Sequence, residues 1–226
     1  MIEDSHEYHS WKHIDESSIL VVNGNDTGYR NEPINIFSHA IEEKYVYFNN
    51  LPGTDAIPCY AGCWQDLVGA KNPVESMMRS LCWQLLKFPI PSVRAHSTPA
   101  AFMNALQRFE IDTLCSLFQE LCLAYSLRNT QDGRKTLVIL IDGGNVFQPQ
   151  YEHPNGKHEA FKKAMKAFRA AVVMMKQLSD PIVLKLLLVF PGQPSDVLME
   201  EGVISVLTLP RKFDDTSADE VRVPRW

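Results

Sequence analysis

The sequence lacks several features that mark whole classes of protein. No apolar run approaches the roughly 20 residues that span a bilayer, and residues 1–11 are acidic and His-rich instead of basic and then apolar. We therefore expect neither a membrane span nor a secretory signal. Positive charge is not in excess, because 22 Lys and Arg stand against 27 Asp and Glu, a net charge of −5. No global field attracts nucleic acid or an anionic membrane.

Cysteine is also scarce. The five cysteines are an odd number in a chain of 226 residues, which is long enough to bury a core without disulfides. We therefore expect reduced thiols and a cytoplasmic location. Cys59 and Cys63 have no second Cys or His pair at zinc spacing, so we interpret them as small packing side chains.

The N-terminal segment is polar and carries His6, His9 and His13 at helical spacing. With neighbouring carboxylates, such a set is one that a metal ion can use. Because chain termini are usually loosely ordered, we interpret residues 1–16 as a flexible, solvated segment and predict no metal. Residues 211–226 are rich in charges of both signs, contain proline, and are interpreted as a frayed tail.

Between these ends, apolar runs alternate with amphipathic segments. Strands are predicted at residues 18–23, 136–141, 184–190 and 203–209, and at 45–48 and 57–64, of which only one need join the sheet. Helices are predicted at residues 33–43, 72–86 and 159–178, with a helix pair at 99–128. The alternation predicts one α/β domain over residues 17–210, with a parallel sheet and right-handed crossovers.

A candidate anion-binding loop follows the first strand and precedes a helix. The phosphate-loop pattern is G-x-x-x-x-G-K-[ST]. Here the first glycine matches, whereas the second glycine, the lysine and the hydroxyl are replaced. The candidate residues are Gly24, Asn25, Asp26, Thr27, Gly28, Tyr29, Arg30 and Asn31.

Three further segments complete a family resemblance. Residues 79–86 (RSLCWQLL) carry a helix pattern, Asp142 ends an apolar strand where the family has D-A-L-D-E, and Gln193 stands where the family has the arginine of S-S-R-P. Together with the loop, residues 17–210 resemble the core of the signal-transduction ATPases with numerous domains (STAND), in particular the NACHT-like domains of many fungal proteins. The resemblance implies a three-layer fold like that of P-loop NTPases, with sheet order 5-1-4-3-2 and helices on both faces.

Departures from the family pattern weaken the expected grip on nucleotide. Tyr29 fills a position where close backbone approach favours glycine, Arg30 replaces the compact lysine, and Asn31 replaces the hydroxyl that binds Mg²⁺. Glu32 places an anion in the first helical turn. Val146 replaces the family's glutamate, so no carboxylate is present there to orient an attacking water.

These residues favour a non-catalytic NTPase-like module that acts as a protein-interaction or signalling scaffold. The expected partner is a protein, with self-association one form, and no cofactor is expected. Two alternatives stay open. One is an active ATP- or GTP-binding STAND NTPase in which Arg30 serves for the lysine and Asp142 holds Mg²⁺. The other is an enzyme of unrelated chemistry in the crevice at the carboxyl edge of the sheet, beside residues 147–157.

Two other patterns favour no site. Ser195 and Asp196 with a loop histidine lack the G-x-S-x-G turn that exposes a nucleophile, so no hydrolytic triad is predicted. The lysines at residues 162–166 have no interleaved aromatic residues, and we interpret them as the solvated face of a helix.

Overall fold

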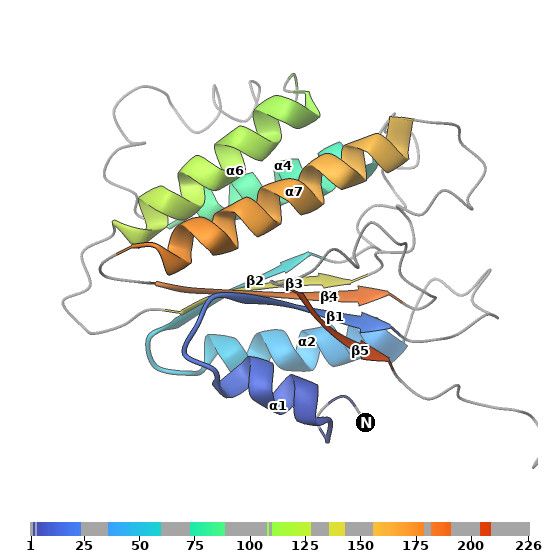
Figure 1. Ribbon diagram of the computed structural model, residues 1–226, viewed down its shortest axis with the longest axis vertical. Coiled ribbons are helices and arrows are strands. Elements are labelled where there is room, and N and C mark those ends of the chain that lie inside the picture. The colour runs from blue at the N-terminus through green and yellow to red at the C-terminus, as the bar shows by residue number, and fades with distance from the viewer. Residues whose placement is uncertain are drawn as a thin grey trace, which may run out of the picture.

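A computed structural model of the chain provides the fold (Figure 1). The residues it describes are 2, 4–23, 36–59, 73–88, 108, 110–127, 136–142, 156–178, 182–190 and 204–208. Helices lie on both faces of a central sheet, which gives the layered arrangement of an α/β fold.

Five strands form one sheet in the order β2-β3-β4-β1-β5, and every pairing in it is parallel. The predicted order, 5-1-4-3-2, is the same order read from the opposite edge. Both the order and the parallel direction are therefore confirmed. The strands are β1 (Ser18–Asn23), β2 (Thr54–Cys59), β3 (Thr136–Asp142), β4 (Val183–Phe190) and β5 (Ile204–Thr208).

Continuous apolar runs form the central strands because both faces of the sheet are covered. In β4, Leu184, Leu186 and Leu188 pack into one hydrophobic cluster, whereas Leu187 and Val189 pack into a second cluster on the opposite face. A shift of one residue in register would exchange the two faces. The burial pattern therefore fixes how these strands pair.

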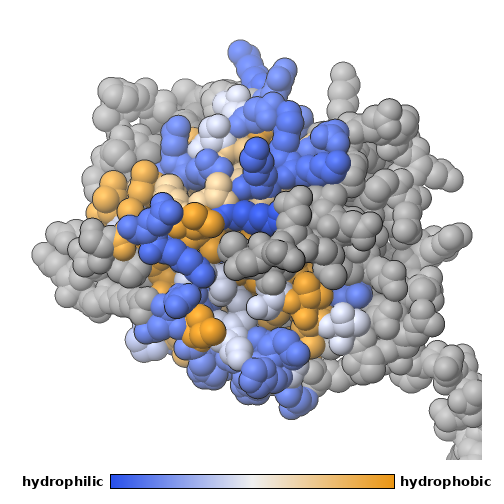
Figure 2. Space-filling model, viewed as in Figure 1, coloured by the Kyte–Doolittle hydropathy of each residue, from blue (hydrophilic) through white to orange (hydrophobic). Residues whose placement is uncertain are grey.

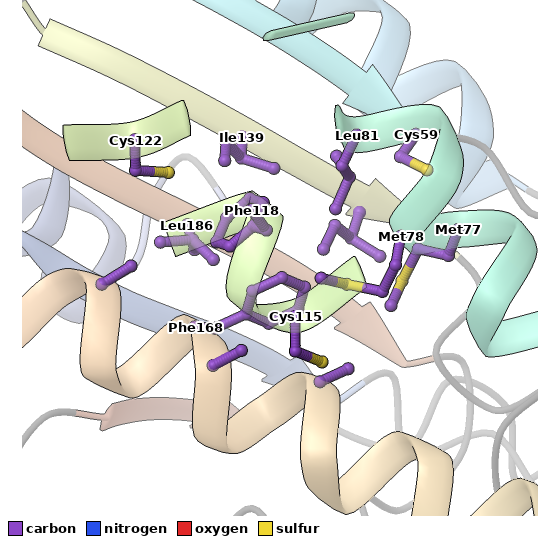
Figure 3. Packing of buried hydrophobic residues seen from close by; sticks show 14 of the residues in the cluster. Cys59, Met77, Met78, Leu81, Cys115, Phe118, Cys122, Ile139, Phe168 and Leu186 are labelled. Carbon is purple, nitrogen blue, oxygen red and sulfur yellow. The ribbon is translucent and has the colours of Figure 1, made fainter. Parts of the chain in front are cut away.

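Three helices build the larger core on one face of the sheet. α4 (Pro73–Leu86) packs against β2, α7 (Gly156–Lys176) packs against β4 and β1, and α6 (Ile111–Ser126) packs against both helices (Figure 1). Met77 and Met78 of α4 are fully buried and fill this core. Phe118 of α6 meets Phe168 of α7 edge to face, with 5.2 Å between ring centroids (Figure 3).

α2 (Ile36–Asn49) covers the other face and packs against β2 and β3. The predicted strand at residues 45–48 is therefore wrong, because these residues form the last turn of α2. Ile41, Lys44 and Phe48 are buried while Val46 and Tyr47 are exposed. This spacing of three to four residues is helical, and the run of β-favouring residues does not override it.

The N-terminal segment is also structured, contrary to the expected solvated terminus. α1 (His6–His13) lies against β1 and β5, and its side chains Tyr8 and Trp11 are buried. The Ser5 hydroxyl caps the helix by accepting a hydrogen bond from the backbone N–H of Tyr8, at 3.1 Å. Two aromatic side chains one turn apart thus attach an otherwise polar helix to the core.

β2 is an edge strand and begins earlier than the predicted run at residues 57–64. Gly53, with φ 70°, turns the chain into it, and Thr136 donates its N–H to the Gly53 carbonyl at 2.8 Å. An edge strand tolerates Pro58, which has no N–H to donate. The Pro58 carbonyl instead accepts a hydrogen bond from the Gln84 side chain of α4, at 2.9 Å.

The outer face of α7 carries the predicted solvated lysines. Lys162 pairs with Glu159 at 3.1 Å, and Lys163 pairs with Asp112 of α6 at 2.7 Å. These side chains are exposed, and Figure 2 shows hydrophilic side chains gathered over α6 and α7. Exposed pairs of this kind add little stability. The interpretation of Lys162, Lys163 and Lys166 as a solvated helix face is confirmed.

Candidate functional site

The carboxyl ends of the parallel strands meet at one edge of the sheet, where open α/β sheets bind their ligands. β3 ends at Asp142 and β1 ends at Asn23, and their exposed fractions are 1% and 7%. The register aligns Asp142 with Val189 of β4, and Val189 with Val22 of β1. Asp142 and Asn23 therefore lie at adjacent levels of this edge, separated by β4.

The two residues belong to opposite faces of the sheet. Asp142 shares the strand alternation of Leu140, whose cluster lies on the α1 and α2 side, whereas Asn23 shares that of Ile19, on the α4 and α7 side. With β4 between them, the β1 and β3 backbones are about 10 Å apart. Asp142 thus places a buried carboxylate on the α2 side of the edge.

α2 brings a helix start to the same side. Because β1 and β2 are parallel, the helix that connects them runs back across the sheet and begins near the carboxyl edge (Figure 1). α2 also packs against β3, the strand that Asp142 ends. The start of α2 and the buried carboxylate of Asp142 therefore lie on the same face of the sheet, toward the same edge.

Most of the predicted site residues lie outside the described residues. These are the loop at residues 24–31, Gln193, Val146 and the segment at residues 147–157. Of the predicted site residues, the structure locates Asp142. It therefore describes the frame around the candidate loop and leaves the loop contacts as predictions.

Sequence reasoning missed a group of aromatic and lysine side chains on the α2 face, which we name the α1 seam. It comprises Tyr8 and Trp11 of α1, Lys44 and Phe48 of α2, and Lys185 of β4. The Lys185 ammonium group donates hydrogen bonds to the backbone carbonyls of Trp11 and Lys12, the latter at 2.9 Å. It also lies 5.5 Å from the centroid of the Trp11 ring, and is 3% exposed.

Burial in the seam changes proton affinity. It lowers the pKa of Lys44, whose ammonium lies 5.4 Å from the Tyr8 ring centroid. Burial also raises the pKa of the Tyr8 hydroxyl, with a smaller contribution from Tyr47. Two features of the sequence could have indicated the α1 seam. One is a lysine inside the apolar run at residues 183–190, and the other is a pair of aromatic residues one helical turn apart after Ser5. Neither pattern identifies its partner without the fold.

The thiols between α4 and α6 are unsuited to nucleophilic chemistry. Burial raises the pKa of Cys82 to about 12, with a further contribution from Cys115, and burial raises the pKa of Cys115 to about 11. Burial also raises the pKa of Cys122. A reactive cysteine needs a lowered pKa and access to solvent. All three thiols belong to the hydrophobic core, and Figure 3 shows Cys115 and Cys122 within its apolar packing, where their role is structural.

Within the described parts of the chain, no three His, Cys, Asp or Glu side chains gather in a way that suits a metal ion. None of the helices in those parts is long and apolar enough to cross a bilayer. Comparison with known proteins finds no match to any protein-family model and none to any curated protein sequence.

Proposed function

We propose that this protein is a non-catalytic, NTPase-like module of the NACHT type found in fungal STAND proteins. It serves as a cytoplasmic scaffold for protein association and binds nucleotide weakly or not at all. The observation that carries the proposal is the sheet order β2-β3-β4-β1-β5, with a buried acid at the end of β3 on the side where α2 begins. This frame is the one that the residue-level resemblance implies.

The weakness of nucleotide binding follows from the donor set. Mg²⁺ prefers near-octahedral oxygen ligands and is usually held by one or two carboxylates together with substrate phosphates. Asp142 is one carboxylate, and the sequence offers Asn31 and Val146 where the family has a hydroxyl and an acid. Arg30 reaches phosphate as a planar fork instead of a compact cation. These residues fit a weak anion site better than a hydrolytic one.

Cytoplasmic location is supported by the thiols. Cys82, Cys115 and Cys122 are free and buried in apolar surroundings. A chain folded in an oxidising compartment would more commonly pair its cysteines. Reduced thiols in a core of this size agree with a reducing environment.

Isothermal titration of the full chain with Mg-ATP and with Mg-GTP tests the proposal. We expect no heat of binding, or an affinity in the millimolar range. Micromolar affinity together with turnover would instead establish the active NTPase, in which Arg30 replaces the lysine. The Arg30→Ala variant is the matched control, because it removes the cation that the active alternative needs and leaves Asp142 in place.

A further inference from the structure

We propose that α1 is an exchangeable arm, which docks on the sheet of a second copy of this chain and so forms a dimer. The proposal gives the protein association of the scaffold a specific form, and to that extent rests on the proposed function. Its structural basis is the α1 seam and the short connection between α1 and β1.

The docking surface under α1 is apolar and has a charged end. Leu20, Val22, Leu187 and Leu207 form it together with Phe48, whose ring meets Trp11 edge to face at 5.9 Å. Lys185 stands among these side chains and binds the carbonyls of the last turn of α1. A cation there complements the negative end of the helix dipole. The surface therefore recognises an aromatic pair and a helix C-terminus together.

α1 is held by few groups. It has eight residues, of which Tyr8 and Trp11 are buried. The backbone of a segment this short loses much of its conformational freedom on docking, and two anchors offset that loss only in part. The Lys185 hydrogen bonds and the Lys12 ammonium, 4.1 Å from the Tyr47 ring centroid, supply further attraction. α1 is thus attached through a small set of side chains, all of which belong to elements that a second copy of the chain also presents.

The connection to β1 is short, and a buried hydrogen bond to Ser17 holds its far end. The Ser17 hydroxyl accepts a hydrogen bond from the N–H of Leu184 at 2.9 Å, and Glu16 pairs with Lys176 at 3.3 Å. Between the end of α1 and these anchors lie Ile14 and Asp15, where the chain reverses direction (Figure 1). Short reversing hinges favour exchange of an arm between copies.

Among the described residues, exchange preserves the contacts that α1 makes. Its partners belong to α2, β1, β4 and β5, and a second copy presents the same groups in the same arrangement. The closed monomer and the exchanged dimer therefore use the same docking surface. They differ in the conformation of the hinge and in the translational freedom that two chains lose when they associate. Mass action then makes the dimer fraction rise with protein concentration.

Sedimentation velocity on the full chain over about a hundredfold range of concentration tests this. We expect a dimer whose fraction rises with concentration, falls when four Gly/Ser residues are inserted between Ile14 and Asp15, and rises when Asp15 is deleted. Trp11→Ala should abolish the dimer. A chain that stays monomeric throughout, including the Asp15 deletion, overturns the proposal. So does a dimer that the insertion and Trp11→Ala leave unchanged.

A second measurement does not depend on the dimer. A fluorescent peptide of residues 1–15 should bind the full-length Trp11→Ala variant, whose own arm lacks its anchor. Its affinity should be at least about tenfold weaker for the Trp11→Ala/Lys185→Met protein, as expected for loss of hydrogen bonds from a charged group. Circular dichroism and a cooperative urea transition confirm that the variants fold. Lack of peptide binding to the folded Trp11→Ala chain overturns the proposal, whatever the nucleotide titrations of the scaffold proposal give.

Discussion

At the scale of single residues, the thiols between α4 and α6 link packing to pH. Burial raises the pKa of Cys82 from 9.0 to about 12 and that of Cys115 from 9.0 to about 11. The native chain therefore keeps protons that the unfolded chain releases. The contribution of these two thiols to the free energy of unfolding is fully present below pH 9.0. It is lost as the pH rises toward their two pKa values in the native state.

We predict that the free energy of unfolding falls more steeply between about pH 8 and about pH 10.5 in the natural chain than in the Cys82→Ala/Cys115→Ala variant, because the variant has two fewer linked protons. Urea titrations at both pH values measure the slope. The cavities left by the substitutions lower stability at both pH values and cancel in the comparison. Equal slopes would mean that these thiols do not hold their protons in the native state.

Asp142 is the one predicted site residue that the structure locates, and its expected contribution is small. We predict that Asp142→Ala lowers the free energy of unfolding by about 1 to 2 kcal/mol and changes any nucleotide affinity only modestly, since the sequence offers Asn31 and Val146 where the family has the other groups that act on magnesium and water. Urea unfolding and isothermal titration measure both effects, with Asp142→Asn as the isosteric control. Turnover of about 1 to 100 per second in the natural chain, abolished by either variant, would contradict the non-catalytic proposal.

The sequence predicted Asp142 and missed Lys185, for a physical reason. An acid that ends an apolar strand is placed by the strand alone, because parallel strands bring their carboxyl ends to one edge. A lysine within a strand has a role only once its neighbour across the sheet face is known. That neighbour is the last turn of α1, some 170 residues earlier in the chain, at separations of 174 and 173 residues.

At the scale of elements, prediction succeeded where the apolar face was long. α4 presents Val74, Met77, Met78, Leu81 and Leu85 on one buried face, and its bounds were predicted to within a residue. α1 was not predicted from the sequence, because its buried face consists of two residues. The last turn of α2 was predicted as a strand because its aromatic and β-branched residues favour a strand locally. Tertiary packing overrides that preference and makes the segment helical.

We predict that Trp11→Ala lowers the free energy of unfolding by about 2 to 4 kcal/mol, because it removes the main anchor of α1 and uncovers the face of β1 and β5. Hydrogen exchange should show that the amides of α1 lose protection while those of α4 keep it at low denaturant. Leu127→Ala, at a position 72% exposed, is the matched control and should change little. Equal protection of α1 in both variants would show that Trp11 is not the anchor.

At the scale of the whole molecule, the strands and their spatial order were predicted on different grounds. Hydrophobic periodicity gave the strands and the α/β class, since each buried run is visible by itself. It gives no spatial order, because many orders of five parallel strands bury the same runs. The predicted order of the strands came from the family resemblance. The pairing of β1 with β4 and β5 confirms that order. The assignment of residues 24–31 as a candidate phosphate loop still depends on that resemblance.

The last prediction tests the loop as part of this frame. Restoring Tyr29→Gly, Arg30→Lys, Asn31→Ser and Glu32→Thr together should raise nucleotide affinity more than any single reversion. Phosphate binding needs close backbone approach, a compact cation and a magnesium ligand at once, while Glu32 opposes all three, so the effects are non-additive. Isothermal titration with Mg-ATP on the four single variants and the quadruple variant measures the coupling. A quadruple variant that unfolds cooperatively yet gains no affinity would show that the loop between β1 and α2 is not a degenerate phosphate site, and the NACHT-like proposal would lose its chemical basis while the sheet order remained.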